Sequence, residues 1–441
     1  MDLWSATPEQ LRATLVDAGQ RRAYLITHPK TGKLSASHDS LASFVRALRE
    51  GCSDYHGHQA GFFEIGAASG HLLTAWIHKT VRGQAAGGVR LWPYDHVEGL
   101  VRDGLRLSRG MGHKNALAGL WWGGGKGVIA RRADVDHRDP EMRRKIYQDY
   151  GRFMTGLCGC YVTAEDAGTT ADDMGWIFST TRHTTCIAEA VGGSGNPSVL
   201  TAKGVVVAME AALHALDQGS LEGKTVVMQG LGNVSYYMIG DLLERRVARI
   251  IGSDIDEAAI EKVRRRYGAD AVEARLVAPG DETILGERCD VLAPNGLGAI
   301  LNASTIPTIR AAVVCGAANN QLEQHDRDAP ALAARGVLYV PDFLANRMGI
   351  VNCANEAYGS FDGDPAIWSH LDREAPHGIW RRALEVFDRA KGSGRTPADE
   401  AQALADELAE EPHPIWGNRS QLIIDALVRE GWAEQPPLEP R

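Results

Sequence analysis

Two lysines in an apolar, glycine-rich stretch are the first residues of this chain whose type and spacing suggest chemistry. Lys114 and Lys126 lie 12 residues apart, in the segments 110–120 and 121–127. Few acidic residues are near them in the sequence, and burying an ammonium group is unfavourable unless it is paired or deprotonated. A lysine that binds a carboxylate, or whose pKa is lowered for proton transfer, fits these surroundings. Two surface lysines with their stems on apolar surface are the alternative.

An acid pair follows the next apolar stretch. Residues 161–164 read as the end of a strand, and Glu165 and Asp166 come directly after them, ahead of Gly168. A carboxylate at the end of a strand can act as a general base. An ordinary surface turn is the other interpretation of the pair taken by itself.

A glycine turn lies between a β-branched strand at 225–229 and a helix that continues to about residue 246. The turn comprises Gly230, Leu231, Gly232, Asn233, Val234 and Ser235. Gly230 permits a tight turn, and Gly232 lets a pyrophosphate approach the backbone at the start of the helix. Ser235 stands where a third glycine is common and is small enough for close packing of helix on strand.

The next strand ends in Asp254, 24 residues beyond Gly230. An acidic side chain there accepts hydrogen bonds from the ribose hydroxyls of a dinucleotide and repels a 2′-phosphate. Ile255 and Asp256 follow, so no cation is adjacent. The pattern predicts NAD, in preference to NADP, as the cofactor.

The order of motifs along the chain resembles the glutamate/leucine/phenylalanine/valine dehydrogenase family, and the leucine dehydrogenase branch is the most similar. The motifs are Gly87-Gly88-Val89-Arg90, Gly110-Met111-x-x-Lys114, Gly124-Gly125-Lys126, Ala164-Glu165-Asp166-x-Gly168-Thr169-Thr170, Gly195-Asn196-Pro197-Ser198, Gly230-x-Gly232-Asn233-Val234, Asn319-Asn320 and Pro341-Asp342-x-x-x-Asn346. The similarity extends from about residue 65 to 360.

The resemblance implies an NAD-dependent amino-acid dehydrogenase, which converts an L-amino acid to its 2-oxo acid and ammonium. Lys114 would bind the substrate α-carboxylate above Gly87 and Gly88. Lys126 would activate water through its lowered pKa, and Asp166 would carry protons. Thr201 and Asn320 would contact the nicotinamide and its ribose. Each of these residues stands at the matching position of a family motif.

The same resemblance limits the substrate side chain. Ala86 stands where glutamate-specific members have a lysine, and three other pocket positions, Ala164, Ile350 and Cys353, are small or apolar. An aliphatic or aromatic side chain is therefore expected. Arg347-Met348 departs from the small residues of the leucine-like members: the arginine would narrow the pocket, bind a polar substrate, or face solvent.

The expected fold is α/β with two domains separated by a cleft. An N-terminal extension (1–60) and a substrate-binding and oligomerisation domain (61–200) precede a doubly wound, Rossmann-type NAD domain (201–350). Helices follow at 351–441 and are expected to pack back toward the substrate domain. Strand-like segments alternate with helical ones after residue 200, which is typical of a parallel sheet covered by helices on both faces.

Composition narrows the class of protein. The chain has 441 residues, a net charge of −9 and seven cysteines without a CxxC pair. These features argue against nucleic acid as a partner and predict no metal site. The N-terminus lacks a signal-peptide pattern and no apolar run reaches about 18 residues, so a cytoplasmic protein without a membrane partner is expected. The resemblance to the family implies that it is a homo-oligomer. The alternatives are an oxidoreductase for a modified or polar amino or imino acid, and a catalytically idle relative with a regulatory role.

Overall fold

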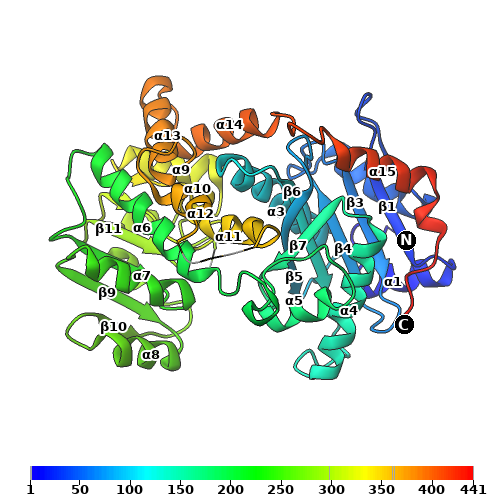
Figure 1. The fold of residues 1–441 in the computed structure, drawn as a ribbon, viewed down its shortest axis with the longest axis horizontal. Helices are drawn as coiled ribbons and strands as arrows, with labels where there is room; N and C mark the ends of the chain where they lie inside the picture. Colours follow the sequence, from blue (N-terminus) through cyan, green and yellow to red (C-terminus); the bar gives the residue numbers. More distant parts are fainter. Residues whose placement is uncertain (1, 297, 360, 362, 441) are drawn as a thin grey trace. The chain divides into compact units, whose positions relative to one another are not determined.

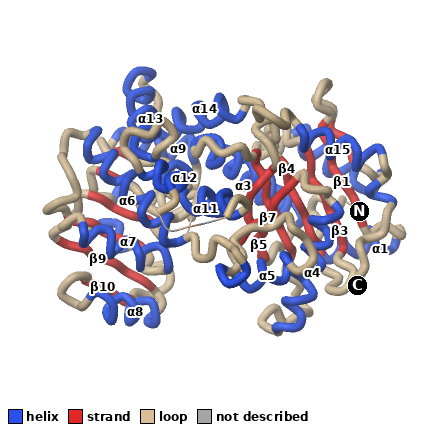
Figure 2. Tube along the Cα trace, in the orientation of Figure 1, coloured by secondary structure: helices blue, strands red, loops and turns tan. Residues whose placement is uncertain are grey.

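The chain forms two compact units in a computed structural model that describes residues 2–296, 298–359, 361 and 363–440. Unit 1 comprises residues 1–195, 356–360 and 407–441, and unit 2 comprises 196–355 and 361–406. Each unit contains one sheet flanked by helices, as Figure 1 and Figure 2 show. Each is described by itself below.

The sheet of unit 1 has the strand order β2-β1-β3-β4-β6-β5-β7. The strands are β1 (Arg22–Thr27), β2 (Leu34–Ala36), β3 (Ala60–Ile65), β4 (Leu72–Ile77), β5 (Ala85–Trp92), β6 (Gly123–Ala130) and β7 (Tyr161–Glu165). Pairing is antiparallel from β2 to β6 and parallel among β6, β5 and β7. The helices are α1 (Pro8–Asp17), α2 (Ala42–Glu50), α3 (Val97–Leu117), α4 (Pro140–Gly156), α5 (Ala171–Phe178) and α15 (Arg419–Arg429).

The first 60 residues are an integral part of this sheet. β1 pairs with β3 over five residues, from Arg22 opposite Glu64 to Ile26 opposite Ala60. The buried Arg22 also binds Glu64 at 2.6 Å and lies over the ring of Trp432. The segment expected as an extension therefore contributes to the core of unit 1, and its Arg22 packs against Trp432 near the C-terminus.

Unit 2 contains a wholly parallel sheet with the order β10-β9-β8-β11-β12-β13. The strands are β8 (Thr225–Gln229), β9 (Arg249–Asp254), β10 (Glu273–Leu276), β11 (Val291–Pro294), β12 (Val313–Val314) and β13 (Leu338–Tyr339). The helices are α6 (Ser198–Ala215), α7 (Asn233–Glu244), α8 (Glu257–Tyr267), α9 (His325–Ala334), α10 (Asp342–Ala345), α11 (Met348–Glu356), α12 (Pro365–Trp368), α13 (Ile379–Ser393) and α14 (Pro397–Ala409). This is the doubly wound arrangement expected from the sequence.

The C-terminal helices divide differently from the expectation. Residues 361–406, which include α12 and α13, group with the parallel sheet of unit 2, and only 407–441 group with unit 1. The reason is packing: α13 lies against α6 and α10, and its buried Ile379 comes close to Gly204 of α6.

One helix, α6, is long and apolar enough by length and composition to cross a membrane. Its apolar sequence includes Lys203 and Glu210, and 61% of the helix is buried inside the protein. The core helix of a unit passes the same test, so the observation carries little weight.

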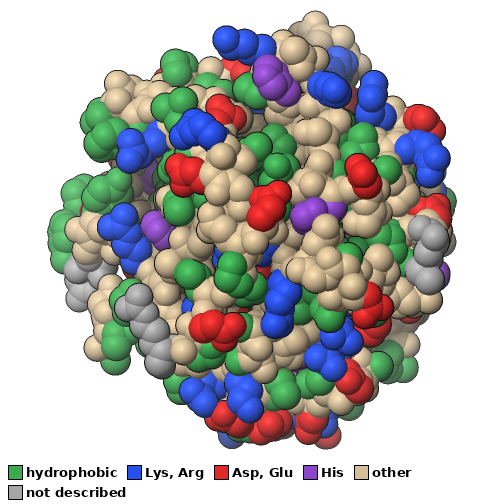
Figure 3. Space-filling view, turned by 90° about the vertical axis from the view of Figure 1, so that its right-hand side faces the viewer, with side chains coloured by type: hydrophobic (Ala, Val, Ile, Leu, Met, Phe, Trp, Pro, Cys, Tyr) green, Lys and Arg blue, Asp and Glu red, His purple; other side chains and the backbone are tan. Residues whose placement is uncertain are grey.

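On the surface, Lys and Arg side chains lie among Asp and Glu side chains on the face drawn in Figure 3.

Candidate active site

A buried lysine and a carboxylate form an ion pair on the parallel part of the unit 1 sheet. Lys126 lies in the middle of β6 and is 3% exposed, and its Nζ is 2.9 Å from Oδ1 of Asp166. Asp166 follows the last residue of β7, and β5 separates β7 from β6. The motif that contains Lys126 and the motif that contains Asp166, both expected to carry chemistry, are therefore in direct contact.

Glycines let the neighbours of this pair come close. Successive side chains of a strand point to opposite faces, so Gly124 and Lys126 share one face of β6. A Cβ at Gly124 would lie 2.3 Å from the carbonyl oxygen of Ser108 in α3, so that face of β6 is covered by the helix backbone. On β5, a Cβ at Gly88 would lie 2.8 Å from Cβ of Asp166. A Cβ at Gly87 would lie 2.0 Å from the carbonyl oxygen of Gly125.

A second cation holds the other oxygen of the carboxylate. Nε of Arg90 donates to Oδ2 of Asp166 at 2.9 Å, and its Nη1 reaches Oδ2 of Asp103 at 3.0 Å. Tyr94 donates its hydroxyl to the same Asp103 oxygen at 2.6 Å. Sequence reasoning gave Arg90 and Asp103 no role. The parallel register, which pairs Val89 with Glu165, places Arg90 beside Asp166.

Burial and the neighbouring charges shift the pKa of both Lys126 and Asp166. Burial lowers the pKa of Lys126; Asp166 opposes this and Arg90 adds to it, and the net direction is downward. Burial raises the pKa of Asp166, but Lys126 and Arg90 together outweigh burial and hold that pKa below its usual range. The pair thus has an ionised carboxylate beside a lysine that loses its proton more readily than usual.

The other unit 1 residues of the predicted site lie on the same strands and on α3. Lys114 is half-buried in the last turn of α3. Ala86 on β5 is wholly buried, and Ala164 on β7 is 5% exposed and pairs with Gly88. Nδ2 of Asn115, next to Lys114, donates to the carbonyl of Gly123 at 2.7 Å and so ties the end of α3 to β6.

In unit 2 the glycine turn follows β8 and begins α7, as the sequence predicts. Gly230 has φ +95°, which favours glycine, and a Cβ there would be 2.8 Å from the backbone nitrogen of Gly296. Gly232 caps α7, whose first residues are Asn233 and Val234, and a Cβ at Gly232 would meet no atom within 4 Å. The open space lies at the N-terminus of a 12-residue helix, where backbone N–H groups favour an anion.

Asp254 ends β9 and contacts the glycine turn directly. Its Oδ2 accepts from the backbone N–H of Leu231 at 2.7 Å, and its Oδ1 accepts from that of Asp256 at 2.9 Å. A carboxylate offers about four acceptor positions, so two bonds leave capacity for ribose hydroxyls. The turn itself is braced by Ser235, whose hydroxyl donates to the carbonyl of Gly230 at 2.6 Å.

Thr201 and Asn320 occupy different positions of unit 2. Thr201 lies in α6 and donates its hydroxyl to the carbonyl of Pro197 at 2.8 Å. Asn320 is exposed, with φ +53°, and its backbone N–H donates to Oδ2 of Asp342 at 2.5 Å. Asp342 belongs to the Pro341-Asp342 motif, so that motif positions the loop that carries Asn320.

The predicted pocket residues Ile350 and Cys353 lie on α11 and are buried, at 7% and 3% exposure. Arg347, just before this helix, is 0% exposed, so the interpretation that it faces solvent is wrong. Its guanidinium donates to the backbone carbonyl of His377, which joins the start of α11 to the segment before α13. Burial, together with Arg382, lowers the pKa of Arg347 to about 9.

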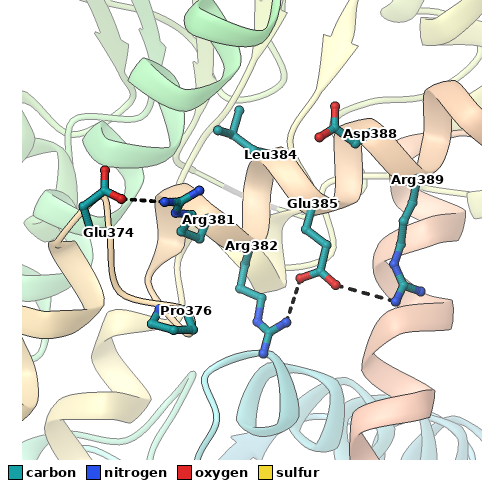
Figure 4. Close-up of a pocket in the computed structure, with 8 residues that line it drawn as sticks. All are labelled: Glu374, Pro376, Arg381, Arg382, Leu384, Glu385, Asp388 and Arg389. Atoms are coloured by element: carbon teal, nitrogen blue, oxygen red, sulfur yellow. Dashed lines mark hydrogen bonds and ion pairs between the residues drawn. The ribbon is translucent and has the colours of Figure 1, made fainter.

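A surface hollow of about 700 Å³ lies along α13 in unit 2 (Figure 4). It is lined by Glu374, Pro376, Arg381, Arg382, Leu384, Glu385, Asp388 and Arg389. Most of its charged groups pair with one another: Arg381 with Glu374 at 2.5 Å, and Arg382 and Arg389 with Glu385 at 2.7 and 3.6 Å. None of the predicted site residues lines this hollow. Among the residues that the structure describes, no group of three or more His, Cys, Asp or Glu side chains could hold a metal ion.

Comparison with known proteins identifies the family. Residues 63–183 match the family model described as Glu/Leu/Phe/Val dehydrogenase, dimerisation domain, and residues 192–374 match the model described as Glutamate/Leucine/Phenylalanine/Valine dehydrogenase. The chain belongs to this family. Its members are amino-acid dehydrogenases, so the protein is an oxidoreductase that acts on CH–NH₂ donors, and the family and the Rossmann-type unit imply a nicotinamide cofactor.

Individual family members cover most of the chain. It is 42% identical to the leucine dehydrogenase of Bacillus cereus over 336 residues, which is 76% of this chain and 85% of the relative. It is 37% identical to the valine dehydrogenase of Streptomyces coelicolor over 365 residues, or 82% and 95% of the two chains. The crystal structure of L-tryptophan dehydrogenase from Nostoc punctiforme superposes with a TM-score of 0.65 and 32% identity, covering 87% of this chain and 100% of that one.

Proposed function

We propose that this protein catalyses the reversible, NAD-dependent oxidative deamination of an L-amino acid with an apolar or aromatic side chain. The observation that carries the proposal is the buried Lys126 in contact with Asp166 at 2.9 Å. If the pair were purely structural, it would stabilise the fold no more than apolar residues of similar volume would. In a dehydrogenase it supplies a base and an activated lysine side by side.

The roles in unit 1 follow from charge and position. Lys114, in the last turn of α3, binds the substrate α-carboxylate, and the motif match assigns Gly87 and Gly88 of β5 to the floor of that site. Asp166 takes a proton from the substrate amino group. Lys126, with its lowered pKa, then activates the water that hydrolyses the imino acid. The products are a 2-oxo acid and ammonium.

The residues of unit 2 fit a dinucleotide. The empty space beyond Gly232 at the start of α7 suits a pyrophosphate, and Thr201 and Asn320 are assigned to the nicotinamide and its ribose. Asp254, followed by Ile255 and Asp256, favours ribose hydroxyls over a 2′-phosphate, which supports NAD. The nicotinamide held by these residues would supply the acceptor for the hydride from the substrate Cα.

The substrate class rests on small and apolar residues together with the relatives. Ala86 and Ala164 on neighbouring strands offer no cation for a distal carboxylate, and Ile350 and Cys353 on α11 are apolar. The similar proteins named above are leucine, valine and L-tryptophan dehydrogenases. No observation favours a polar substrate, since Arg347 is wholly buried and donates to the His377 carbonyl.

We also propose that the protein assembles as a homo-oligomer through unit 1 and acts in the cytoplasm. The support for assembly is the description of the family model over residues 63–183 as a dimerisation domain. Light scattering of the full chain tests it, and a monomer at all working concentrations would contradict it.

The activity is tested with purified protein, NADH, ammonium and a panel of 2-oxo acids, with absorbance as the readout. Turnover is expected with branched aliphatic or aromatic 2-oxo acids. Lys126→Ala should lower kcat on the order of 10³- to 10⁴-fold and leave NAD binding unchanged. Lys145→Ala is the matched control, because Lys145 is a partly exposed lysine of α4 whose carboxylate neighbour is Glu141. Absence of turnover with every 2-oxo acid, despite cofactor binding, would refute the proposal.

A further inference from the structure

We propose that Arg90, anchored by Asp103, is a positioning residue that holds Asp166 against Lys126 and sets the pH range in which this pair works. The inference rests on the proposed function of the pair and extends it to two residues of β5 and α3. It identifies a chain of four alternating charges, Lys126–Asp166–Arg90–Asp103, which we call the charge relay.

The geometry of the charge relay fixes the carboxylate from both sides. Lys126 binds Oδ1 of Asp166 at 2.9 Å, and Nε of Arg90 binds Oδ2 at the same distance. With the lysine alone, the carboxylate could rotate about its Cβ–Cγ bond. The planar guanidinium is charged at every working pH and leaves one orientation for the carboxylate.

Arg90 is itself held by α3. Its Nη1 donates to both oxygens of Asp103, at 3.0 and 3.3 Å, and its side chain is 19% exposed. Asp103 also accepts from the Tyr94 hydroxyl at 2.6 Å and from Nη2 of Arg106 at 3.1 Å. An exposed surface pair would contribute little, but Arg90 and Asp103 are mostly out of water and have several partners each.

The relay has an electrostatic consequence with a definite sign. Arg90 lowers the pKa of Lys126 and of Asp166, whereas Asp103 raises the pKa of Lys126. The charged or titratable groups that interact with Asp166 include Lys126 of β6, Arg90 of β5, Tyr161 and Glu165 of β7, and Tyr94, whereas Asp103 of α3 acts on Lys126 and Asp173 of α5 acts on Glu165. Removal of the cation should therefore move the acid limb of activity to higher pH, and removal of the Asp103 charge should move it to lower pH.

The experiment compares Arg90→Gln, Arg90→Lys and Asp103→Asn in the full-length enzyme. Arg90→Gln should lower kcat on the order of 100-fold and raise the acid limb of kcat/KM by about 1 pH unit. Arg90→Lys keeps the positive charge but loses the planar guanidinium. We therefore expect kcat to stay low, while the acid limb of kcat/KM returns toward its pH in the unaltered enzyme. Asp103→Asn should lower kcat less and shift the limb downward.

Arg102→Gln is the matched control, because Arg102 lies on α3 one residue before Asp103 and binds Glu98 and Asp54 instead of the relay. It should change neither kcat nor the pH profile. Opposite shifts for Arg90→Gln and Asp103→Asn distinguish the relay from general loosening, which would lower kcat without opposed shifts. Equal-sign shifts, or an unchanged kcat in Arg90→Gln, would overturn the inference.

A readout without turnover separates this inference from the proposed activity. The ammonium of Lys126 is titrated by NMR in lysine-labelled protein, with Lys126→Ala providing the assignment. Its pKa should rise in Arg90→Gln and fall in Asp103→Asn. If these shifts occur in a protein that turns over no amino acid, the relay stands and the proposed reaction falls; if turnover is normal but the shifts are absent, the relay falls alone.

Discussion

Glycine serves opposite purposes in the two units. On β6 of unit 1, the space above Gly124 is filled by protein: a Cβ would lie 2.3 Å from the Ser108 carbonyl oxygen and 3.0 Å from Cα of Gly112. At the start of α7 in unit 2, the space above Gly232 is empty to 4 Å. The first glycine is required by a helix packed on the strand, and the second leaves room for a ligand.

The contrast bears on how glycine-rich motifs are interpreted. Both segments are rich in glycine, and both lie next to residues of the predicted site. In unit 1 the glycines bring α3, β5 and β7 close enough for Lys126 and Asp166 to meet. In unit 2, Gly232 leaves open space beside the backbone N–H groups at the start of α7. The same residue type thus positions side chains in one unit and a cofactor in the other.

The largest expected effect is the loss of stability in Gly124→Ala. The added methyl group meets backbone atoms of α3 at 2.3 and 2.9 Å, and backbone cannot rotate away as a side chain can. Overpacking of this kind costs about 3 kcal/mol or more of the free energy of unfolding. Urea denaturation of the full chain measures it.

Gly175→Ala is the control for this substitution. Gly175 lies in α5, and a Cβ there would meet no atom within 4 Å. Alanine is the better helix former by about 1 kcal/mol, so this variant should be as stable as the unaltered protein or more so. If Gly124→Ala proved equally stable, α3 would not pack against β6 as closely as described, and the contrast between the units would fail.

The sequence predicts most of unit 2 because its signals are local. The strand expected at 225–229 corresponds to β8, the strand expected to end at Asp254 corresponds to β9, and the glycine turn lies between β8 and α7. β10 was not anticipated, because Glu273–Leu276 is short and lies at the polar edge of the sheet. The grouping of α13 with α6 depends on packing between distant segments, which no local pattern reports.

The site in unit 1 shows the same division between local and distant information. Lys126 and Asp166 stand in motifs, so their chemistry could be anticipated from type and spacing. Asp103 stands in no motif, and its contact with Arg90 depends on the way α3 crosses the sheet. Arg347 was open to three interpretations, and only its burial against the His377 carbonyl excludes exposure to solvent.

A smaller effect, on binding instead of folding, is expected for Gly232→Ala. Gly232 has φ −66°, which alanine adopts without strain, and the Cβ of an alanine at this position would enter empty space. The free energy of unfolding should therefore change by no more than about 0.5 kcal/mol. The methyl group would occupy the place proposed for the pyrophosphate, so the Kd for NAD, measured by calorimetry, should rise by roughly tenfold or more.

The two outcomes together test the comparison. A destabilised Gly232→Ala with normal NAD affinity would mean that this glycine, like Gly124, is required by the fold. Gly223→Ala is not a suitable control, because Gly223 has φ +74° and would be strained by any side chain. Gly240→Ala in α7 is better, because the nearest atoms to its Cβ belong to the flexible end of Tyr267, at 3.2 Å. It should leave the Kd unchanged.

The smallest effect is expected at Asp254, where one side chain serves both the fold and the ligand. Asp254→Asn keeps an oxygen for one of the two backbone donors, Leu231 or Asp256, and loses the negative charge. Stability should fall by about 1 kcal/mol, because one backbone N–H loses its acceptor in a half-buried turn. The preference for NAD over NADP should narrow severalfold, since the carboxylate no longer repels a 2′-phosphate. The ratio of kcat/KM for the two cofactors measures this, and an unchanged ratio in a stably folded variant would restrict Asp254 to bracing the turn, with cofactor preference set by other residues of unit 2.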